Sequence, residues 1–197
     1  MHISLINFKL RHICVFSIKK LMKSKKNLVF IGMMGSGKTS IGSLVSKKLK
    51  LNFFDIDAEI EKELDMKISK IFQSKGEIFF RKLEEKITLK FLKNENGVFS
   101  LGGGAFNNEY IQNEVLKNNL SFWLKWDSKT LINRIKNSEK RPIAFKSTDE
   151  ELIDLIKKRS NIYAKALYKI NCENKTKLEI TNKILKIYET HSAESSD

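Results

Sequence analysis

The residues best suited to chemistry form a glycine-rich run, Gly32-Met33-Met34-Gly35-Ser36-Gly37-Lys38-Thr39. The run matches G-x-x-x-x-G-K-[ST], a pattern typical of loops that cradle phosphate groups. Glycine lets the backbone approach phosphate oxygens, Lys38 can reach the β- and γ-phosphates, and the Thr39 hydroxyl can ligate Mg²⁺. The alternative is a glycine-rich turn without a ligand. The predicted nucleoside triphosphate site consists of Gly35, Ser36, Gly37, Lys38, Thr39 and Ser40.

Two carboxylates, Asp55 and Asp57, form a D-x-D pair after a second apolar segment. In an extended backbone, residues two apart face the same side, so both carboxylates are expected in one cleft. One can hold Mg²⁺ through water while the other accepts a proton from an attacking hydroxyl, as phosphoryl transfer requires. The alternative is a helix cap, because Asp57 precedes the helical run Ala58-Glu59-Ile60.

Arginine is scarce in this lysine-rich chain and is found only at positions 11, 81, 134, 141 and 159. An arginine in such a chain favours a need for its planar, bidentate fork, and the alternative is an ordinary surface charge. Arg81 has an acid, Glu84, three residues further on, a spacing that allows a one-turn ion pair. Arg141-Pro142 follows a polar stretch that resembles a mobile lid.

Two further motifs lie in the second half of the chain. Gly102-Gly103-Gly104 comes directly after an apolar segment and offers bare backbone N–H groups with room for a ligand. Arg159 and Tyr163 lie within a long helical pattern.

These residues must be positioned by strands and helices that alternate along the chain. Leu28–Ile31 predicts a buried strand before the glycine-rich run, and the spacing of Ile41, Leu44, Val45 and Leu49 predicts a helix after it. Such alternation indicates a parallel sheet covered on both faces, with ligands at the carboxyl ends of the strands. The other predicted strands cover 53–55, 98–101, 121–125 and 169–172, and the other predicted helices cover 77–93, 128–135, 149–168 and 178–188.

Composition limits the partners. The net charge of +14 comes from lysine spread along the chain, without an arginine-rich tract or basic-aromatic platform, so no nucleic-acid partner is predicted. The sequence has no run of 18 apolar residues, so no membrane span is predicted. Cys14 and Cys172 match no metal or redox spacing, which favours reduced thiols and a cytoplasmic location. The histidines of the chain lie near its two ends, so none is predicted to be a catalytic base.

The ends of the chain differ from its middle. Residues 1–24 are basic and apolar without an acid, and they are predicted to be an N-terminal extension, either an organelle leader or the product of a start assigned upstream of Met22. A single domain is predicted for residues 25–190 and a polar tail for 191–197.

Taken together, the motifs resemble those of the shikimate kinase family over roughly Lys26 to Tyr188. The phosphate loop, D-x-D, G-E-x-x-F-R-x-x-E, the glycine triplet, R-P and R-x-x-x-Y occur in the family's order. Leu101 stands where the family often has a small or hydroxyl residue. The resemblance implies a nucleoside-monophosphate-kinase-like α/β P-loop fold with three layers, a five-stranded parallel sheet in the order 2-3-1-4-5, and a short lid.

The resemblance also implies a reaction, the ATP-dependent phosphorylation of the 3-hydroxyl of shikimate in chorismate and aromatic amino acid biosynthesis. ATP and Mg²⁺ are the implied cofactors, and a monomer is implied. Lys38, Asp57 and Arg141 would be catalytic, with Arg141 on the lid and in contact with ATP. Thr39 and, through water, Asp55 would hold Mg²⁺. Shikimate would be bound by Asp57, Arg81, Gly102, Gly103, Gly104 and Arg159.

Three alternatives remain. A gluconate or nucleotide kinase would explain the phosphate loop but not the glycine triplet with both arginine motifs. A catalytically silent binding protein of the same fold is disfavoured by the intact Lys38, Asp55 and Asp57. A nucleic-acid-binding P-loop protein is suggested by charge alone.

Overall fold

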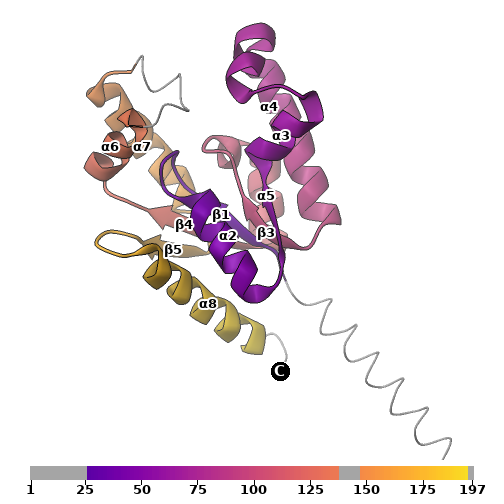
Figure 1. Ribbon diagram of the computed structural model, residues 1–197, viewed down its shortest axis with the longest axis vertical. Coiled ribbons are helices and arrows are strands. Elements are labelled where there is room, and N and C mark those ends of the chain that lie inside the picture. The colour runs from indigo at the N-terminus through magenta and orange to yellow at the C-terminus, as the bar shows by residue number, and fades with distance from the viewer. Residues whose placement is uncertain (1–25, 138–146, 195–197) are drawn as a thin grey trace, which may run out of the picture.

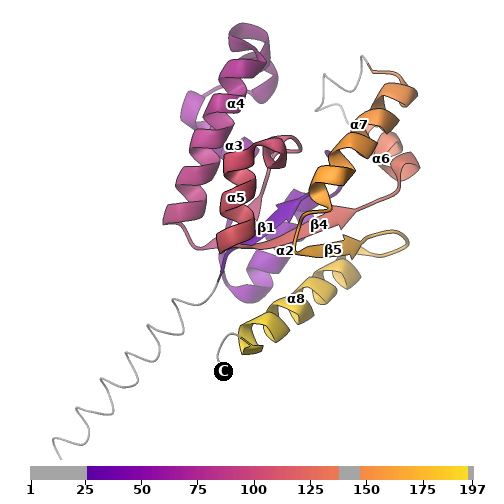
Figure 2. The same cartoon turned by 180° about the vertical axis from the view of Figure 1, so that it is seen from behind.

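The alternation of strands and helices produces a five-stranded sheet between two layers of helices (Figures 1 and 2). The computed structural model describes residues 26–137 and 147–194. All of the strand pairs are parallel. The strands are β1 (Leu28–Ile31), β2 (Asn52–Asp55), β3 (Gly97–Ser100), β4 (Leu120–Lys125) and β5 (Tyr168–Asn171). The helices are α2 (Lys38–Leu49), α3 (Ile56–Leu64), α4 (Ile68–Asn94), the short 3₁₀ helix η1 (Ala105–Asn107), α5 (Glu109–Asn118), α6 (Ser128–Lys136), α7 (Asp149–Tyr163) and α8 (Lys177–Glu194).

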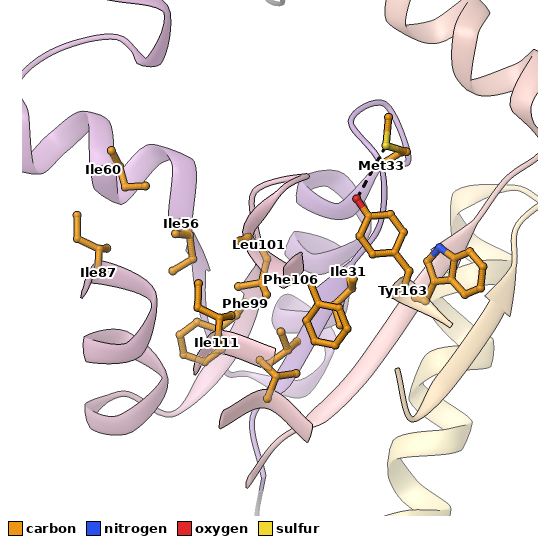
Figure 3. Close-up of a cluster of buried hydrophobic side chains, with 14 of the residues drawn as sticks. Ile31, Met33, Ile56, Ile60, Ile87, Phe99, Leu101, Phe106, Ile111 and Tyr163 are labelled. Carbon is orange, nitrogen blue, oxygen red and sulfur yellow. Dashed lines mark hydrogen bonds between the residues drawn. The ribbon is translucent and has the colours of Figure 1, made fainter. Parts of the chain in front are cut away.

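The side-chain alternation of β1 explains the two helical layers. Leu28 and Phe30 belong to a buried cluster with α2 and α8, while Val29 and Ile31 belong to a second cluster with residues of α3, α4, α5 and α7. A strand that is apolar at every position must be covered on both faces. Figure 2 shows α5 and α7 on the face opposite α8, and Figure 3 shows the second cluster. The four residues of β1 therefore connect both layers of the core.

The strand order β2-β3-β1-β4-β5 confirms the predicted 2-3-1-4-5 topology. After β1 the chain builds β2 and β3 on one side of that strand and then β4 and β5 on the other. The loop after β1 thus starts at the point where the direction of sheet building reverses, which is where open α/β sheets bind ligands.

Two predicted helix boundaries were wrong. The helix predicted over 149–168 ends at Tyr163, because Tyr168 pairs with Phe122 in the sheet and the Leu167 N–H donates to the Ser121 hydroxyl at 2.8 Å. Helix α8 runs on to Glu194, past the predicted end at Tyr188 and into the predicted polar tail. Strand pairing thus ends α7 earlier than its sequence pattern predicts, and the pattern alone did not predict the longer α8.

Helix α4 consists of two helices joined at Gly76, whose φ of 78° and ψ of 171° are not helical. The second of them contains the predicted 77–93 helix. Helix α3 corresponds to the helical alternative given for the residues after Asp57, whereas α5 and the part of α4 before Gly76 had not been predicted as helices. The predicted lid with Arg141, and the N-terminal extension, lie outside the described residues. No helix in 26–137 or 147–194 is long and apolar enough to cross a membrane.

Candidate active site

The loop between β1 and α2 has a backbone that requires glycine. Gly35 and Gly37 have φ values of 81° and 87°, in the left-handed region that side chains disfavour. The Ser36 N–H donates to the Met33 carbonyl at 3.1 Å, which closes the turn. Helix α2 begins at Lys38, so its unpaired N–H groups and positive dipole end face the loop. This arrangement suits a phosphate group.

Lys38 lies along the same loop. Its ammonium donates to the carbonyls of Gly32 at 2.8 Å and Met33 at 3.0 Å, and the residue is only 8% exposed. The cation is therefore held beside the N-terminus of α2, within reach of an anion in the loop. Ser40, on the first turn of α2, donates its hydroxyl to the Gly37 carbonyl at 3.1 Å.

Thr39 and Asp55 bring together two oxygen ligands suited to a hard cation. The Thr39 hydroxyl donates to Asp55 Oδ2 at 2.6 Å, joining the first turn of α2 to the end of β2. Asp55 Oδ1 also caps α3 by accepting from the Ala58 N–H at 3.4 Å. Hydroxyl and carboxylate oxygens are ligands that Mg²⁺ accepts.

Asp57 reaches the site by a route that differs from the prediction. It is not in an extended segment but in the first turn of α3, and the predicted cap role belongs to Asp55. The local sequence after Asp55 favours a helix, so the prediction of an extended segment here was wrong. A Cβ at Gly102 would lie 2.8 Å from Asp57 Oδ1 and 2.5 Å from Glu84 Oε1. Two carboxylates thus converge on the bare backbone of Gly102.

Arg81 is held by the acids of its own helix. Its Nη1 donates to Glu84 at 2.7 Å, and its Nε and Nη2 donate to Glu77 at 3.2 and 3.1 Å. Burial raises the pKa of Glu84, the Arg81 guanidinium opposes that rise, and the neighbouring Asp57 carboxylate adds to it. A Cβ at Gly104 would lie 2.7 and 2.9 Å from the two terminal nitrogens of Arg81. The predicted one-turn ion pair is therefore present, and it fixes the fork against the glycine triplet.

Arg159 reaches the glycine triplet from α7. A Cβ at Gly103 would lie 3.4 Å from Arg159 Nη1, and this nitrogen is 3.5 Å from the Met33 sulfur of the loop. Its Nε is buried and has no hydrogen-bond partner among the described residues. A buried guanidinium N–H without a partner is costly, unless a bound anion supplies one.

Tyr163, one turn further along α7, donates its hydroxyl to the Gly103 carbonyl. Burial raises the pKa of the phenol to about 12, against the opposing effect of the Arg159 cation. Tyr163 therefore remains a neutral hydrogen-bond donor, and it fixes Gly103 in place between the two arginines.

The predicted site residues that the structure describes thus lie together at the carboxyl ends of β1, β2 and β3. Arg141 lies outside the described residues. Within the described ranges no group of three or more His, Cys, Asp or Glu side chains could hold a metal ion, so a metal here would rely on other ligands, such as phosphate oxygens.

Two residues contact the loop without having been predicted to do so, Trp126 directly after β4 and Arg134 in α6. The Trp126 indole N–H donates to the Ser36 carbonyl at 3.0 Å, and Arg134 Nη1 donates to the Gly35 carbonyl at 3.4 Å. The Arg134 guanidinium stacks on the Trp126 ring at 3.7 Å from its centroid. The scarcity of arginine had marked Arg134, but nothing local pointed to Trp126.

Known proteins resemble this chain over most of its length. The family model for shikimate kinase matches residues 34–189. A shikimate kinase from Persephonella marina is 39% identical over 160 residues, which is 81% of this chain and 97% of that protein. The structure of a shikimate kinase from Acinetobacter baumannii in complex with shikimate superposes with a TM-score of 0.80 at 26% identity, covering 87% of this chain and 97% of that one. The structure of an Aquifex aeolicus shikimate kinase gives a TM-score of 0.73 at 34% identity, covering 86% and 97%.

Proposed function

The chain belongs to the shikimate kinase family, and we propose that the residues gathered at the carboxyl ends of β1, β2 and β3 carry out the family's reaction. The protein is an ATP-dependent phosphotransferase that phosphorylates the 3-hydroxyl of shikimate. The site has three groups of residues. One binds the phosphates, one binds the substrate carboxylate, and one accepts the proton of the reacting hydroxyl.

The glycine-rich loop binds the phosphates of ATP. Its left-handed glycines open the backbone toward the anion, and the N-terminus of α2 adds a positive field. Lys38 stabilises the charge that develops on the transferring phosphoryl group. Thr39 and Asp55, whose oxygens are 2.6 Å apart, would hold Mg²⁺, Asp55 through water. When bound, the ion would neutralise phosphate charge.

Arg81 and Arg159 bind the carboxylate of shikimate. The observation that carries this step is the buried Arg159 Nε without a partner in the described residues, placed across the glycine triplet from the Arg81 fork. Arg81 has five N–H groups and uses three of them on Glu77 and Glu84. The remaining two, one on each terminal nitrogen, suit a bidentate bond to a carboxylate. The bare backbone of Gly102, Gly103 and Gly104 gives the ring of the substrate room.

Asp57 orients the reacting hydroxyl and accepts its proton. Its carboxylate lies at Gly102, next to the glycines that would face the substrate. Glu84 is nearby, but its carboxylate is committed to the ion pair with Arg81 at 2.7 Å, so we assign the proton to Asp57. Arg141 would join from the lid and contact ATP, as the family resemblance implies.

A coupled assay of ADP release tests the substrate. MgATP with shikimate should give turnover, while gluconate and nucleosides should not, because neither pairs a small carboxylated ring with the two-arginine site. Absence of shikimate-dependent ADP release from folded protein would refute the proposal. Monomeric state, cytoplasmic location and the lack of a nucleic-acid partner belong to the same proposal. Light scattering of the purified chain tests the first of these.

The role of Asp57 has its own test. Asp57→Asn should leave the melting temperature close to that of the wild type but remove most of kcat, because an amide cannot accept the proton. The matched control is Asp65→Asn, an aspartate at the far end of α3, which should leave turnover unchanged. Near-normal kcat in the Asp57 variant would remove Asp57 from the base role.

A further inference from the structure

We propose that Trp126 is a positioning residue for ATP, which acts by fixing the carbonyl side of the phosphate loop and not by contacting the base. This role rests on the proposed function, because it requires that the loop of residues 32–39 bind phosphate. Trp126 lies after β4, 90 residues away from the carbonyl it contacts.

Hydrogen bonds within the loop fix only part of its shape. Gly35 and Gly37 have no side chains, and the hydroxyl of Ser36 is buried without a hydrogen-bond partner among the described residues. The turn is closed by the backbone hydrogen bond from the Ser36 N–H to the Met33 carbonyl. Glycine peptides in the left-handed region can rotate at low cost. Lys38, Ser36 and Ser40 hold the carbonyls of Gly32, Met33 and Gly37. Contacts from outside the loop therefore matter most for the peptide groups of Gly35 and Ser36.

Trp126 controls the peptide group that matters. In a planar trans peptide the C=O and the following N–H point in opposite directions. The indole N–H donates to the Ser36 carbonyl at 3.0 Å from the β4 side, so the N–H of Gly37 is directed away from Trp126. Gly37 immediately precedes α2, and an N–H aimed from this position can meet phosphate.

Arg134 completes the same contact surface. Its guanidinium lies over the indole ring at 3.7 Å and donates to the adjoining Gly35 carbonyl at 3.4 Å. Asp127 caps α6 by accepting from the Thr130 N–H at 2.7 Å, which fixes the helix that carries Arg134 relative to Trp126. Two consecutive loop carbonyls are thus held by one stacked pair, which we call the Trp126–Arg134 clamp.

The test separates an effect on the loop from an effect on the base. Trp126→Phe keeps an aromatic face for Arg134 and removes the N–H donor. The KM for ATP should rise about 3- to 10-fold, the size expected from one neutral hydrogen bond, while the KM for shikimate should stay within about twofold. Magnesium tripolyphosphate, used as a competitive inhibitor against ATP, should lose affinity by the same factor. Adenosine, which has no phosphate, should inhibit both proteins equally.

Control variants exclude a general loss of structure. Trp123→Phe alters the other tryptophan of the chain, which is 6% exposed and packs beside Tyr163, and it should lower the melting temperature without changing the Ki of tripolyphosphate. Arg134 is exposed, so Arg134→Lys should fold even if Trp126→Phe does not. It retains the charge but not the stacking plane, and it should also weaken tripolyphosphate.

An unchanged Ki for tripolyphosphate in Trp126→Phe, or a loss seen with adenosine alone, would overturn the inference. If the Phe variant does not fold, an unchanged Ki in Arg134→Lys would do the same. Failure of the wild-type protein to bind tripolyphosphate would instead contradict the proposed function.

Discussion

Arg81→Lys provides the sharpest test of how the site recognises its substrate. Arg81 holds two carboxylates of α4 with three N–H groups, at 2.7 Å to Glu84 and at 3.1 and 3.2 Å to Glu77. It does so while keeping one further N–H on each terminal nitrogen. The single ammonium of lysine cannot span both acids and also form two parallel bonds to a substrate carboxylate.

The expected loss is that of one charge-assisted bond, about 1.5–3 kcal/mol, which corresponds to a rise of about 10- to 150-fold in the KM for shikimate. The KM for ATP should move by less than about twofold, since the guanidinium of Arg81 contacts the acids of α4 and the backbone at Gly104, and the phosphates are assigned to the loop before α2. The measurement is coupled ADP release, with shikimate titrated at saturating MgATP.

The reverse exchange at the adjacent, exposed Lys82 is the matched control, and Lys82→Arg should have wild-type kinetics. An unchanged KM for shikimate in Arg81→Lys, with the wild-type melting temperature, would refute the reasoning. So would an equal rise in the KM for ATP, because the effect would then not be specific to the substrate end of the site.

Two further predictions concern the carboxylates around Gly102. Gly102→Ala places a methyl group 2.5 Å from Glu84 Oε1 and 2.8 Å from Asp57 Oδ1. This variant should lose about 1–3 kcal/mol of stability and have a kcat at least about tenfold lower. Gly103→Ala, whose nearest neighbours lie at 3.3 Å or more, should lose less stability, and equal melting temperatures for the two variants would contradict the geometry. Because burial raises the pKa of Glu84 above its ordinary value of about 4.5, the native state binds more protons than the unfolded state between the two values. The free energy of unfolding should therefore fall as the pH rises through that interval. Glu84→Gln should flatten this fall, and urea unfolding from pH 4 to 8 measures it; an identical pH dependence in both proteins would show that another group is responsible.

Sequence alone predicted much of the local structure of the candidate site because the relevant signals are local. The glycine run from Gly32 to Thr39 needs only its neighbours to form a strand, a turn and a helix start. The pairing of Arg81 with Glu84 follows from helical spacing, and the apolar run of β1 implied a strand buried on both faces. The predicted sheet order came from the family resemblance, and the observed order β2-β3-β1-β4-β5 confirms it.

Asp57 shows where local reasoning failed, because the backbone that it assumed is not the one observed. The spacing of Asp55 and Asp57 predicts a shared face only for an extended backbone, but the chain enters a helix at Ile56. The carboxylate faces Gly102 because α3 packs against α4 and starts directly after β2, the strand that pairs with β3. That orientation depends on how the elements pack and cannot be obtained from a two-residue spacing.

The remaining features were decided by contacts between distant parts of the chain. Helix α7 ends at Tyr163 because Tyr168, five residues later, pairs with Phe122 in the sheet. The Trp126–Arg134 clamp joins residues 90 and 99 positions apart from the carbonyls they hold. A hydrogen bond to a backbone carbonyl needs no particular residue type at the accepting position, so it leaves no pattern in the sequence. Such contacts exist only once the parallel sheet has brought the ends of its strands together.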